Sequence, residues 1–226
     1  MTEALATPLP RINDPAPQFT APSTHGELKL ADYKGKWVVL FSHPADFTPV
    51  CSTEFAAFAR VQADFAVLKT QLIGLSIDSV YSHIAWAREI EKHFKVKIDF
   101  PVIADLSTAV ASAYGMIHPG ASSTATVRAV FVIDPAQIIR ALIYYPLSAG
   151  RSVAEIKRLV QALQANAERS LATPEGWQPG EQLIVPAPTT KADAEKRLTA
   201  DYEVTDWFLS RTKPVAAAPA GAGAGI

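Results

Sequence analysis

The sequence predicts an α/β protein with a central mixed β-sheet flanked by helices and a C-terminal extension. Two continuous apolar runs, residues 37–41 and 71–77, have the composition of strands that are buried on both faces. A helical pattern follows each run, with Phe55 and Phe58 on one face of the first helix and residues 80–94 forming the second. This alternation of strands and helices implies parallel strands joined by crossover helices.

The later part of the chain adds a different kind of pairing. Residues 126–133 and 138–144 have the pattern of two strands, and the short turn at 134–137 suits antiparallel neighbours. The sheet should therefore be mixed. A capping-box signature, Ser152 followed by Glu155, then opens an apolar-striped helix that closes the sheet.

Changes of composition divide the chain into three parts. We expect a main domain over residues 1–170 and a proline- and glycine-rich extension over residues 171–213. Trp177 and the apolar segment 207–209 lie in this extension and need a cover, which we expect a second subunit to provide. Residues 214–226 are almost entirely alanine, glycine and proline, so we expect them to be disordered.

Composition excludes several classes of function. A net charge of -1, with 49% hydrophobic and 19% charged residues, gives no electrostatic reason for nucleic-acid binding. Apolar runs such as 37–41 are far shorter than the roughly 20 residues that span a bilayer, so no membrane contact is expected. The single cysteine cannot form an intramolecular disulfide, and Glu3 lies where a signal peptide would be positive, so we expect a cytoplasmic protein.

Cys51, the only cysteine, lies where a buried strand meets the next helix. Functional residues of α/β folds concentrate at this carboxyl end of a strand. Thr48 is the predicted N-cap and Pro49 the first helical residue, which places Cys51 third in the helix. The free N–H groups and the dipole of a helix start favour a thiolate. The alternative is a small buried apolar residue without chemistry, but the loop and cap residues around it favour reactivity.

Ionisation alone would make a cysteine only modestly more reactive. A free thiol with a pKa of about 8.5 is about 3% ionised at pH 7, so complete ionisation gains about 30-fold. Further acceleration needs donors that stabilise charge on the leaving group. Arg128 lies inside an apolar strand and needs a buried anionic partner, either a carboxylate or the thiolate with its substrate.

Pro44, Thr48 and Cys51 have the spacing of the active-site motif of the peroxiredoxins. The longer block 41–51, Phe-Ser-His-Pro-Ala-Asp-Phe-Thr-Pro-Val-Cys, resembles the one-cysteine subfamily in particular. The resemblance runs from about residue 14 to about residue 208, so it includes that subfamily's C-terminal extension. It implies a thioredoxin-like fold and the reduction of hydrogen peroxide, alkyl hydroperoxides or peroxynitrite.

The resemblance also implies roles for single residues. It implies that the Thr48 hydroxyl binds the peroxide, that Pro44 shields the sulfur, and that Arg128 lies beside the sulfur. Three further positions match residues around this centre, namely His43, Glu54 and Arg151. Glu54 and Arg151 would orient Arg128, or could be surface charges, and His43 is either near the sulfur or structural.

The expected cycle takes Cys51 to a sulfenic acid that an external reductant must regenerate, because the chain has no second cysteine. That reductant would be a small thiol or a redox protein. The resemblance implies a homodimer, with a decameric ring as a further possibility, and we expect no cofactor. Since the histidines match no ligand spacing, we expect no metal site either. His83 and Trp86 match a helix motif of the family, and we assign them to packing.

Three other functions are alternatives or additions to peroxide reduction. Some members of the subfamily also hydrolyse phospholipids, but residues 34–38 lack the serine that this activity needs, and Ala31 stands where its histidine is expected. No Cys-x-x-Cys pair supports a disulfide reductase. A holdase chaperone stays open as an additional role of an oligomer.

Overall fold

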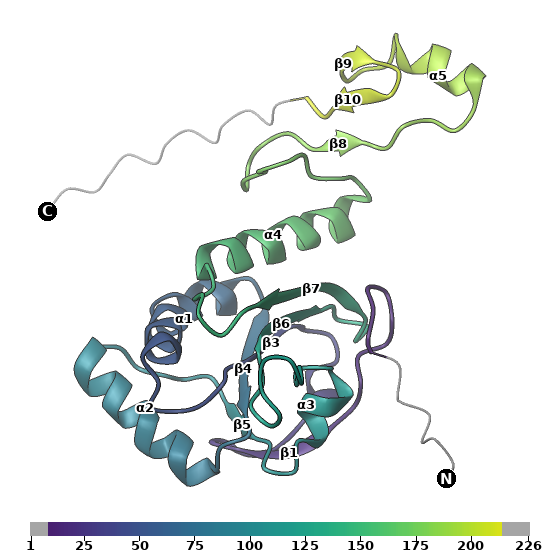
Figure 1. The fold of residues 1–226 in the computed structure, drawn as a ribbon. Coiled ribbons are helices and arrows are strands. Elements are labelled where there is room, and N and C mark those ends of the chain that lie inside the picture. Colours follow the sequence, from purple (N-terminus) through teal and green to yellow (C-terminus); the bar gives the residue numbers. More distant parts are fainter. Residues whose placement is uncertain (1–8, 214–226) are drawn as a thin grey trace, which may run out of the picture. The chain divides into compact units, whose positions relative to one another are not determined.

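The computed structural model describes residues 9–213 of the 226-residue chain, which form two compact units divided between Val153 and Ala154. The first unit is built on a seven-stranded sheet of mixed direction, with helices on both of its faces (Figure 1). The predicted mixed sheet is confirmed. The boundary between the units lies at the start of the helix that the sequence places at the end of the main domain.

The elements of the first unit follow the predicted order. They are β1 (Thr20–Ser23), β2 (Gly26–Lys29), the 3-10 helix η1 (Leu30–Tyr33), β3 (Trp37–Ser42), α1 (Pro49–Val67), β4 (Thr70–Ser76), α2 (Val80–Phe94), β5 (Val102–Ala104), α3 (Ala109–Ala113), β6 (Arg128–Ile133) and β7 (Ile139–Tyr145). The strand order is β2-β1-β5-β4-β3-β6-β7. β3 pairs in parallel with β4 and antiparallel with β6, so it lies where the two kinds of pairing meet.

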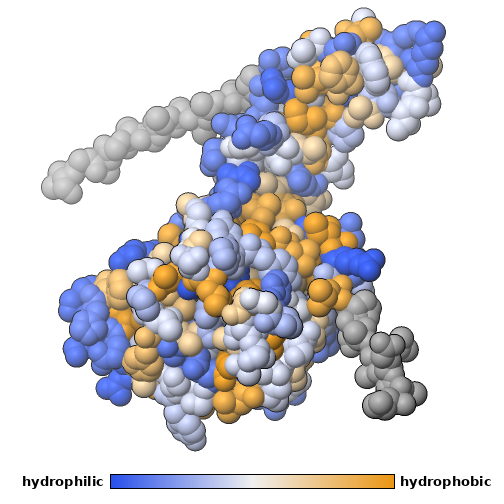
Figure 2. All heavy atoms as spheres, in the orientation of Figure 1, coloured by the Kyte–Doolittle hydropathy of each residue, from blue (hydrophilic) through white to orange (hydrophobic). Residues whose placement is uncertain are grey.

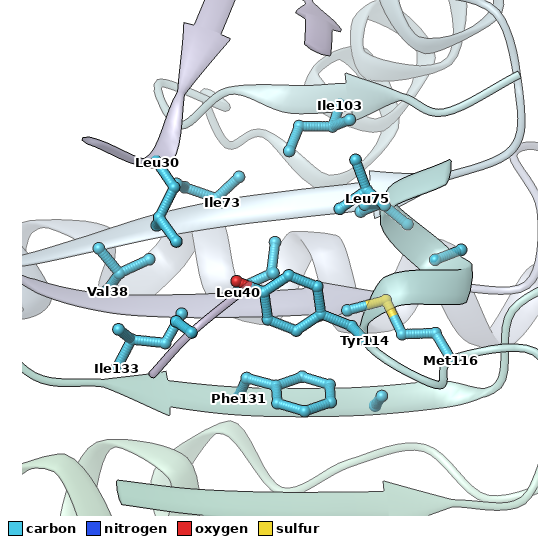
Figure 3. Close-up of a cluster of buried hydrophobic side chains, with 14 of the residues drawn as sticks. Leu30, Val38, Leu40, Ile73, Leu75, Ile103, Tyr114, Met116, Phe131 and Ile133 are labelled. Atoms are coloured by element: carbon cyan, nitrogen blue, oxygen red, sulfur yellow. The ribbon is translucent and has the colours of Figure 1, made fainter. Parts of the chain in front are cut away.

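All residues of β3 are buried, as expected for a strand with helices on both sides of its sheet. Successive side chains of a strand point to opposite faces. Leu40 therefore joins Tyr114, Phe131 and other residues in the core on one face (Figure 3). Phe41 points to the other face and stacks on Phe58 of α1, with ring centroids 4.1 Å apart. This contact fixes α1 against the strand that leads into it.

Short elements account for the differences from the predicted fold. β5 has three residues and α3 has five, and neither was predicted. β1 and β2 form a small hairpin in the proline-rich N-terminal region. Such short segments carry too few residues for a periodic pattern.

The second unit contains α4 (Val153–Arg169), β8 (Ile184–Val185), α5 (Lys191–Arg197), β9 (Glu203–Asp206) and β10 (Leu209–Arg211). β10 pairs antiparallel with both β8 and β9 in a small second sheet, which was not predicted from the sequence. Trp177 is buried within this unit against Ala162 and Leu183, so the prediction that it needs a second subunit as cover was wrong.

Other apolar side chains of the second unit are exposed, and Figure 2 shows hydrophobic residues on its visible surface. Trp207 and Phe208 are 43% and 54% exposed. The predicted disorder of residues 214–226 concerns a segment outside the described residues. No helix within residues 9–213 is long and apolar enough to cross a membrane.

Candidate active site around Cys51

Cys51 lies in the first turn of α1, at the carboxyl end of β3. Thr48 is the N-cap in extended conformation and Pro49 is the first helical residue, which confirms the predicted helix start. The Thr48 hydroxyl makes no capping bond and instead donates to the carbonyl oxygen of Ala45 at 2.9 Å. The two possible tasks of this hydroxyl therefore do not compete. The Cys51 side chain is fully buried.

Arg128 reaches the sulfur from the start of β6. Its Nη1 lies 3.3 Å from Cys51 Sγ and 2.8 Å from Glu54 Oε2. Its Nε and Nη2 both donate to the carbonyl oxygen of Leu147, at 3.1 and 2.8 Å. The guanidinium is thus held on two sides, by a carboxylate and by a backbone carbonyl, and its position beside the sulfur is fixed.

Glu54 is held in turn by Arg151. Arg151 donates to the Glu54 carboxylate from its backbone N–H, from Nε and from Nη2, at 2.7, 2.9 and 2.9 Å. Its Nη1 donates to the carbonyl oxygens of Ser42 and Ala129, which belong to neighbouring strands. Glu54 and Arg151 are both buried, so neither is a surface charge. A chain of hydrogen bonds therefore links the sheet to the sulfur through Arg151, Glu54 and Arg128.

The charges of this cluster favour an anion at Cys51. Two buried guanidinium groups face one carboxylate, which leaves an excess positive charge beside the sulfur. Burial raises the pKa of Glu54, but the hydrogen bonds and charge of Arg151, with the charge of Arg128, outweigh burial and hold this pKa below its ordinary value of 4.5. Glu54 is thus a carboxylate at neutral pH, and the second guanidinium charge is left without a carboxylate partner in this cluster.

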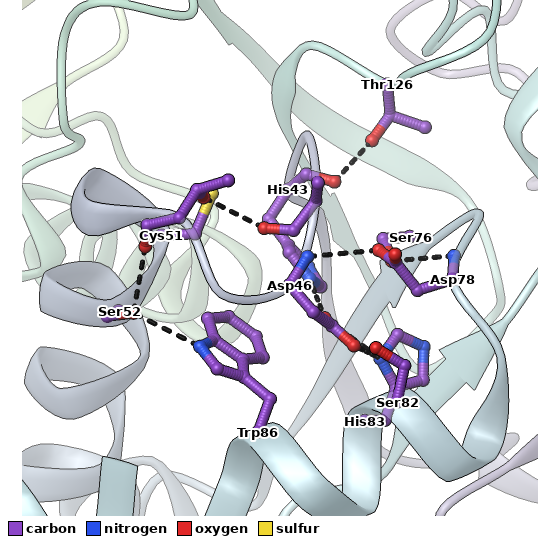
Figure 4. Close-up of polar contacts among 12 residues, drawn as sticks. His43, Asp46, Cys51, Ser52, Ser76, Asp78, Ser82, His83, Trp86 and Thr126 are labelled. Atoms are coloured by element: carbon purple, nitrogen blue, oxygen red, sulfur yellow. Dashed lines mark hydrogen bonds and ion pairs between the residues drawn. The ribbon is translucent and has the colours of Figure 1, made fainter. Parts of the chain in front are cut away.

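A second buried network holds the loop before the helix (Figure 4). Asp46 accepts hydrogen bonds from His43 Nε2 at 2.8 Å and from His83 Nδ1 at 2.8 Å. Thr126 donates to the carbonyl oxygen of His43 at 2.7 Å. Trp86 stacks on the His43 ring and donates from Nε1 to the hydroxyl of Ser52 at 3.1 Å. The loop that carries Thr48 is therefore tied to the segment just before β6 and to α2.

His43, Asp46 and His83 are the one group of described residues that could offer three ligand atoms to a metal ion. The sequence spacing did not reveal this group, because the two histidines lie on different elements. Zinc ligands at about 2.0–2.1 Å from the metal lie about 3.3 Å apart in tetrahedral geometry. The nitrogen–oxygen distances of 2.8 Å are shorter and are those of hydrogen bonds.

Comparisons with known proteins agree with this geometry. Residues 12–142, more than half of the chain, match the AhpC/TSA family, and residues 162–200 match the C-terminal domain of 1-Cys peroxiredoxin. A peroxiredoxin of Aquifex aeolicus (strain VF5) is 53% identical over 216 residues, covering 91% of this chain and 97% of that protein. The chain belongs to the peroxiredoxin family. It is therefore a thiol-dependent peroxidase, and its sequence contains one cysteine, Cys51.

Further relatives and solved structures extend the match. A peroxiredoxin of Methanosarcina mazei is 53% identical over 215 residues, covering 91% of this chain and 98% of the relative. A yeast mitochondrial 1-Cys peroxiredoxin has a TM-score of 0.80 at 40% identity, covering 89% of this chain and 98% of the other. A cysteine-to-serine mutant of the peroxiredoxin 6 of Arenicola marina has a TM-score of 0.79 at 34% identity, covering 90% and 98%. The predicted thioredoxin-like fold is confirmed.

The structure brings together most of the site residues that the sequence predicted for this peroxiredoxin. Arg128 and Glu54 lie within hydrogen-bonding distance of each other, and Arg128 reaches the sulfur as well. Pro44 is half-buried in the loop beside His43, and its shielding of the sulfur stays a prediction. His83 and Trp86 are buried, as packing requires, but both also make polar contacts that the assignment to packing missed.

Sequence reasoning missed four groups that support the site. They are the carboxylate of Asp46, the hydroxyls of Ser42 and Thr126, and the carbonyl oxygen of Leu147. Asp46 lies inside the motif block, but a charged residue in a loop is usually exposed, so the sequence carried no signal of its buried partners. A backbone carbonyl leaves no signal in a sequence, because every residue has one.

Proposed function

We propose that this peroxiredoxin reduces hydrogen peroxide and organic hydroperoxides with Cys51 as the nucleophile, through a sulfenic acid. The observation that carries this proposal is the 3.3 Å separation of Arg128 Nη1 and Cys51 Sγ, in a guanidinium that Glu54 also holds. A buried thiolate next to a fixed cation is an activated nucleophile.

The proposed step transfers one oxygen atom to the sulfur. An electron pair of the Cys51 thiolate forms an S–O bond to the terminal peroxide oxygen, and the O–O bond breaks. The leaving oxygen keeps the electron pair of that bond and takes up a proton, so water or an alcohol departs. The sulfur is oxidised to the sulfenic acid while the peroxide is reduced by two electrons.

Arg128 offers a hydrogen-bond donor to the peroxide, and Thr48 offers a hydrogen-bond acceptor. Four of the five N–H groups of Arg128 are taken up by Leu147, Glu54 and Cys51. The fifth, on Nη2, has no partner among residues 9–213, and we assign it to the charge that develops on the peroxide oxygens. The Thr48 hydroxyl donates its hydrogen to the carbonyl oxygen of Ala45, so its lone pairs are free to accept a hydrogen bond from the O–H of the peroxide.

The direct test is the Cys51→Ser variant, with its folding checked by circular dichroism. It should consume no peroxide, whereas the unaltered chain should consume peroxide and gain the mass of a sulfenic acid. Excess peroxide should then add a second oxygen at Cys51 and give the irreversible sulfinic acid. Retention of most of the activity in Cys51→Ser would sink the proposal.

An external thiol must complete the cycle, because this chain contains a single cysteine. The yeast mitochondrial relative is described as resolving its thiol through the glutathione and thioredoxin systems. For this chain we propose a small thiol or a redox protein of the cytoplasm. Steady-state turnover with glutathione, thioredoxin, glutaredoxin and ascorbate would identify the reductant as the one that supports repeated cycles.

We further propose a homodimer, with residues 171–213 as a dimerisation arm and a decameric ring as a possible larger assembly. Two observations support association. β7 is an edge strand of the large sheet, and Trp207 and Phe208 are exposed on the second unit. Light scattering after size-exclusion chromatography would measure the mass in solution, and a monomer at micromolar concentration would contradict the proposal.

The same exposed apolar side chains support a holdase activity as a second candidate function. Such an activity needs apolar surface and no sulfur chemistry. The Cys51→Ser variant should therefore still suppress the aggregation of a heated client protein. A variant with Trp207 and Phe208 changed to serine should no longer suppress aggregation. If this variant suppressed aggregation as well as Cys51→Ser does, the holdase function would be rejected.

A further inference from the structure

We propose that Asp46 and His83 are positioning residues of the peroxidase reaction, acting through the loop that carries Pro44 and Thr48. The inference rests on the proposed reduction of peroxide at Cys51. Asp46 and His83 form a buried contact between this loop and α2. Their task would be to hold the peroxide-binding side of the site in place while Arg128 holds the other side.

Asp46 is the point at which three parts of the fold meet. Its carboxylate accepts from His43 Nε2, just after the end of β3, and from His83 Nδ1, on α2. Its backbone N–H donates to Asp78 Oδ2 at 3.0 Å, just beyond the end of β4. Ser76 donates to the same oxygen of Asp78 at 2.6 Å and orients it. Hydrogen bonds of both the backbone and the side chain of Asp46 thus fix the conformation of the loop at this residue.

His83 links this point to a further strand. Its Nε2 lies 3.1 Å from the carbonyl oxygen of Ile103 on β5, and its Nδ1 faces the Asp46 carboxylate. Both ring nitrogens therefore face oxygen atoms, and the ring is held at its two ends. Burial raises the pKa of Asp46, but the hydrogen bonds from His43 and His83 hold it well below its ordinary value of 3.8. The contact is a buried hydrogen bond to a carboxylate.

The backbone beside Asp46 shows why the loop needs such a clamp. Phe47, between Asp46 and Thr48, has a φ of 55°, in the left-handed region that bulky residues avoid. Its side chain is 60% exposed, so packing of the ring does not hold this conformation. A strained residue persists only where its neighbours over-determine it. Phe47 is held on one side by Asp46, which is fixed by its hydrogen bonds, and on the other side by the first turn of α1, which begins after Thr48.

Two amide variants of His83 separate the two ends of its ring. In His83→Gln the amide nitrogen can replace Nε2 at Ile103, whereas in His83→Asn it can replace Nδ1 at Asp46. His93→Gln is the matched control, because His93 lies exposed on the same helix and pairs only with Glu89 among the described residues. Asp78→Ala is a milder second variant that removes the backbone tether of Asp46.

Two rates are measured for each protein. One is the second-order rate of Cys51 oxidation by hydrogen peroxide in a stopped-flow instrument, and the other is the rate of Cys51 alkylation by iodoacetamide. Alkylation needs the thiolate but not the peroxide-binding loop, so the pair of rates separates a displaced loop from a lost thiolate. Thermal melts and circular dichroism establish that each variant is folded, and elemental analysis gives its metal content.

We expect His83→Gln to slow oxidation by about 10-fold to 100-fold, the range that follows a displacement of about 1 Å. Alkylation should stay unchanged or become faster, because a loosened loop uncovers the buried sulfur. His83→Asn should recover most of the loss, Asp78→Ala should lose less than His83→Gln, and His93→Gln should match the unaltered chain. If His83→Gln fails to fold, Asp78→Ala alone carries the test.

Several results would overturn the inference. One is oxidation at the unaltered rate in folded His83→Gln or, where that variant fails to fold, in Asp78→Ala. Another is an equal fall of the oxidation and alkylation rates. The others are no recovery in His83→Asn and the presence of one bound metal ion per chain. A failure of the proposed function itself would look different, because the unaltered chain would then not react with peroxide at all.

Discussion

Arg128 Nη1 lies 3.3 Å from Cys51 Sγ. The same nitrogen donates to Glu54 at 2.8 Å, so the guanidinium cannot swing toward the sulfur or away from it without breaking a buried ion pair. Preorganised donors of this kind stabilise a transition state without reorganising during the reaction. The contact between Arg128 and Cys51 therefore places a positive charge and a fixed donor beside the sulfur.

Replacing Arg128 with lysine should keep the charge and lose the fork of donors. An ammonium group has three N–H donors on one nitrogen, so it cannot make the four contacts that Arg128 makes from three separate nitrogens. We expect kcat/KM for hydrogen peroxide to fall by about 100-fold or more, as for the loss of one preorganised donor. Arg140→Lys on β7 is the control, because Arg140 pairs with Asp134. Equal rates for Arg128→Lys and the unaltered chain would show that charge alone suffices.

The Thr48 hydroxyl can be tested with two nearly isosteric changes. Thr48→Val removes the oxygen that we assign to the peroxide O–H, and Thr48→Ser keeps it. We expect Thr48→Val to lower kcat/KM by about 10-fold to 100-fold, since a substrate polar group then lacks its partner. Thr48→Ser should stay close to the unaltered rate in the same stopped-flow assay. A large loss in both variants would indicate that the methyl group matters instead.

Glu54 should make the stability of the fold depend on acid pH. Its pKa is held below its ordinary value of 4.5, so its contribution is fully present above that pH and is lost as the pH falls through the folded-state pKa. Glu54→Gln should cost about 3–5 kcal/mol at pH 7, because it leaves two buried arginines without a counter-charge. Urea denaturation at pH 7 and pH 3.5 should show a smaller loss with acid in the variant.

Glu155→Gln is the matched control for that experiment. Glu155 pairs with Arg158 on α4, and its side chain is 46% exposed. Solvent-exposed pairs contribute about 0–1 kcal/mol, so this variant should change the stability at pH 7 by less than about 1 kcal/mol. If Glu54→Gln changed the stability no more than Glu155→Gln does, the cluster would have no special role in stability.

The sequence predicted the elements that carry the site because their signals are local. Thr48 followed by Pro49 marked the start of α1, and five consecutive apolar residues marked β3. The Thr48 hydroxyl could not be placed from the sequence, since the choice between a capping bond and Ala45 depends on the path of the loop. Motif spacing thus predicted where Cys51 lies but not what its neighbours bond to.

The buried charge networks were beyond sequence reasoning for a related reason. Glu54 and Arg151 meet only because α1 and the turn after β7 come together at one end of the sheet. Asp46 and His83 likewise meet only because α2 packs behind the loop. A lone charged residue in a sequence shows that a partner is needed when it is buried. It does not show which residue that partner is.

His43 should add a second pH dependence, closer to neutrality. Burial lowers its pKa below the ordinary 6.5, with a partial offset from Asp46, so the folded protein keeps His43 neutral where the unfolded chain protonates it. Stability is then fully present above about pH 6.5 and falls below it, by up to about 1.4 kcal/mol per pH unit. His43→Gln keeps a neutral donor near the position of Nε2 and should remove this slope in urea denaturation between pH 7.5 and 5.5. His25 is exposed, so the control variant His25→Gln should keep the pH dependence of the stability. If the pH dependence persisted in His43→Gln, the proton uptake would belong to another group.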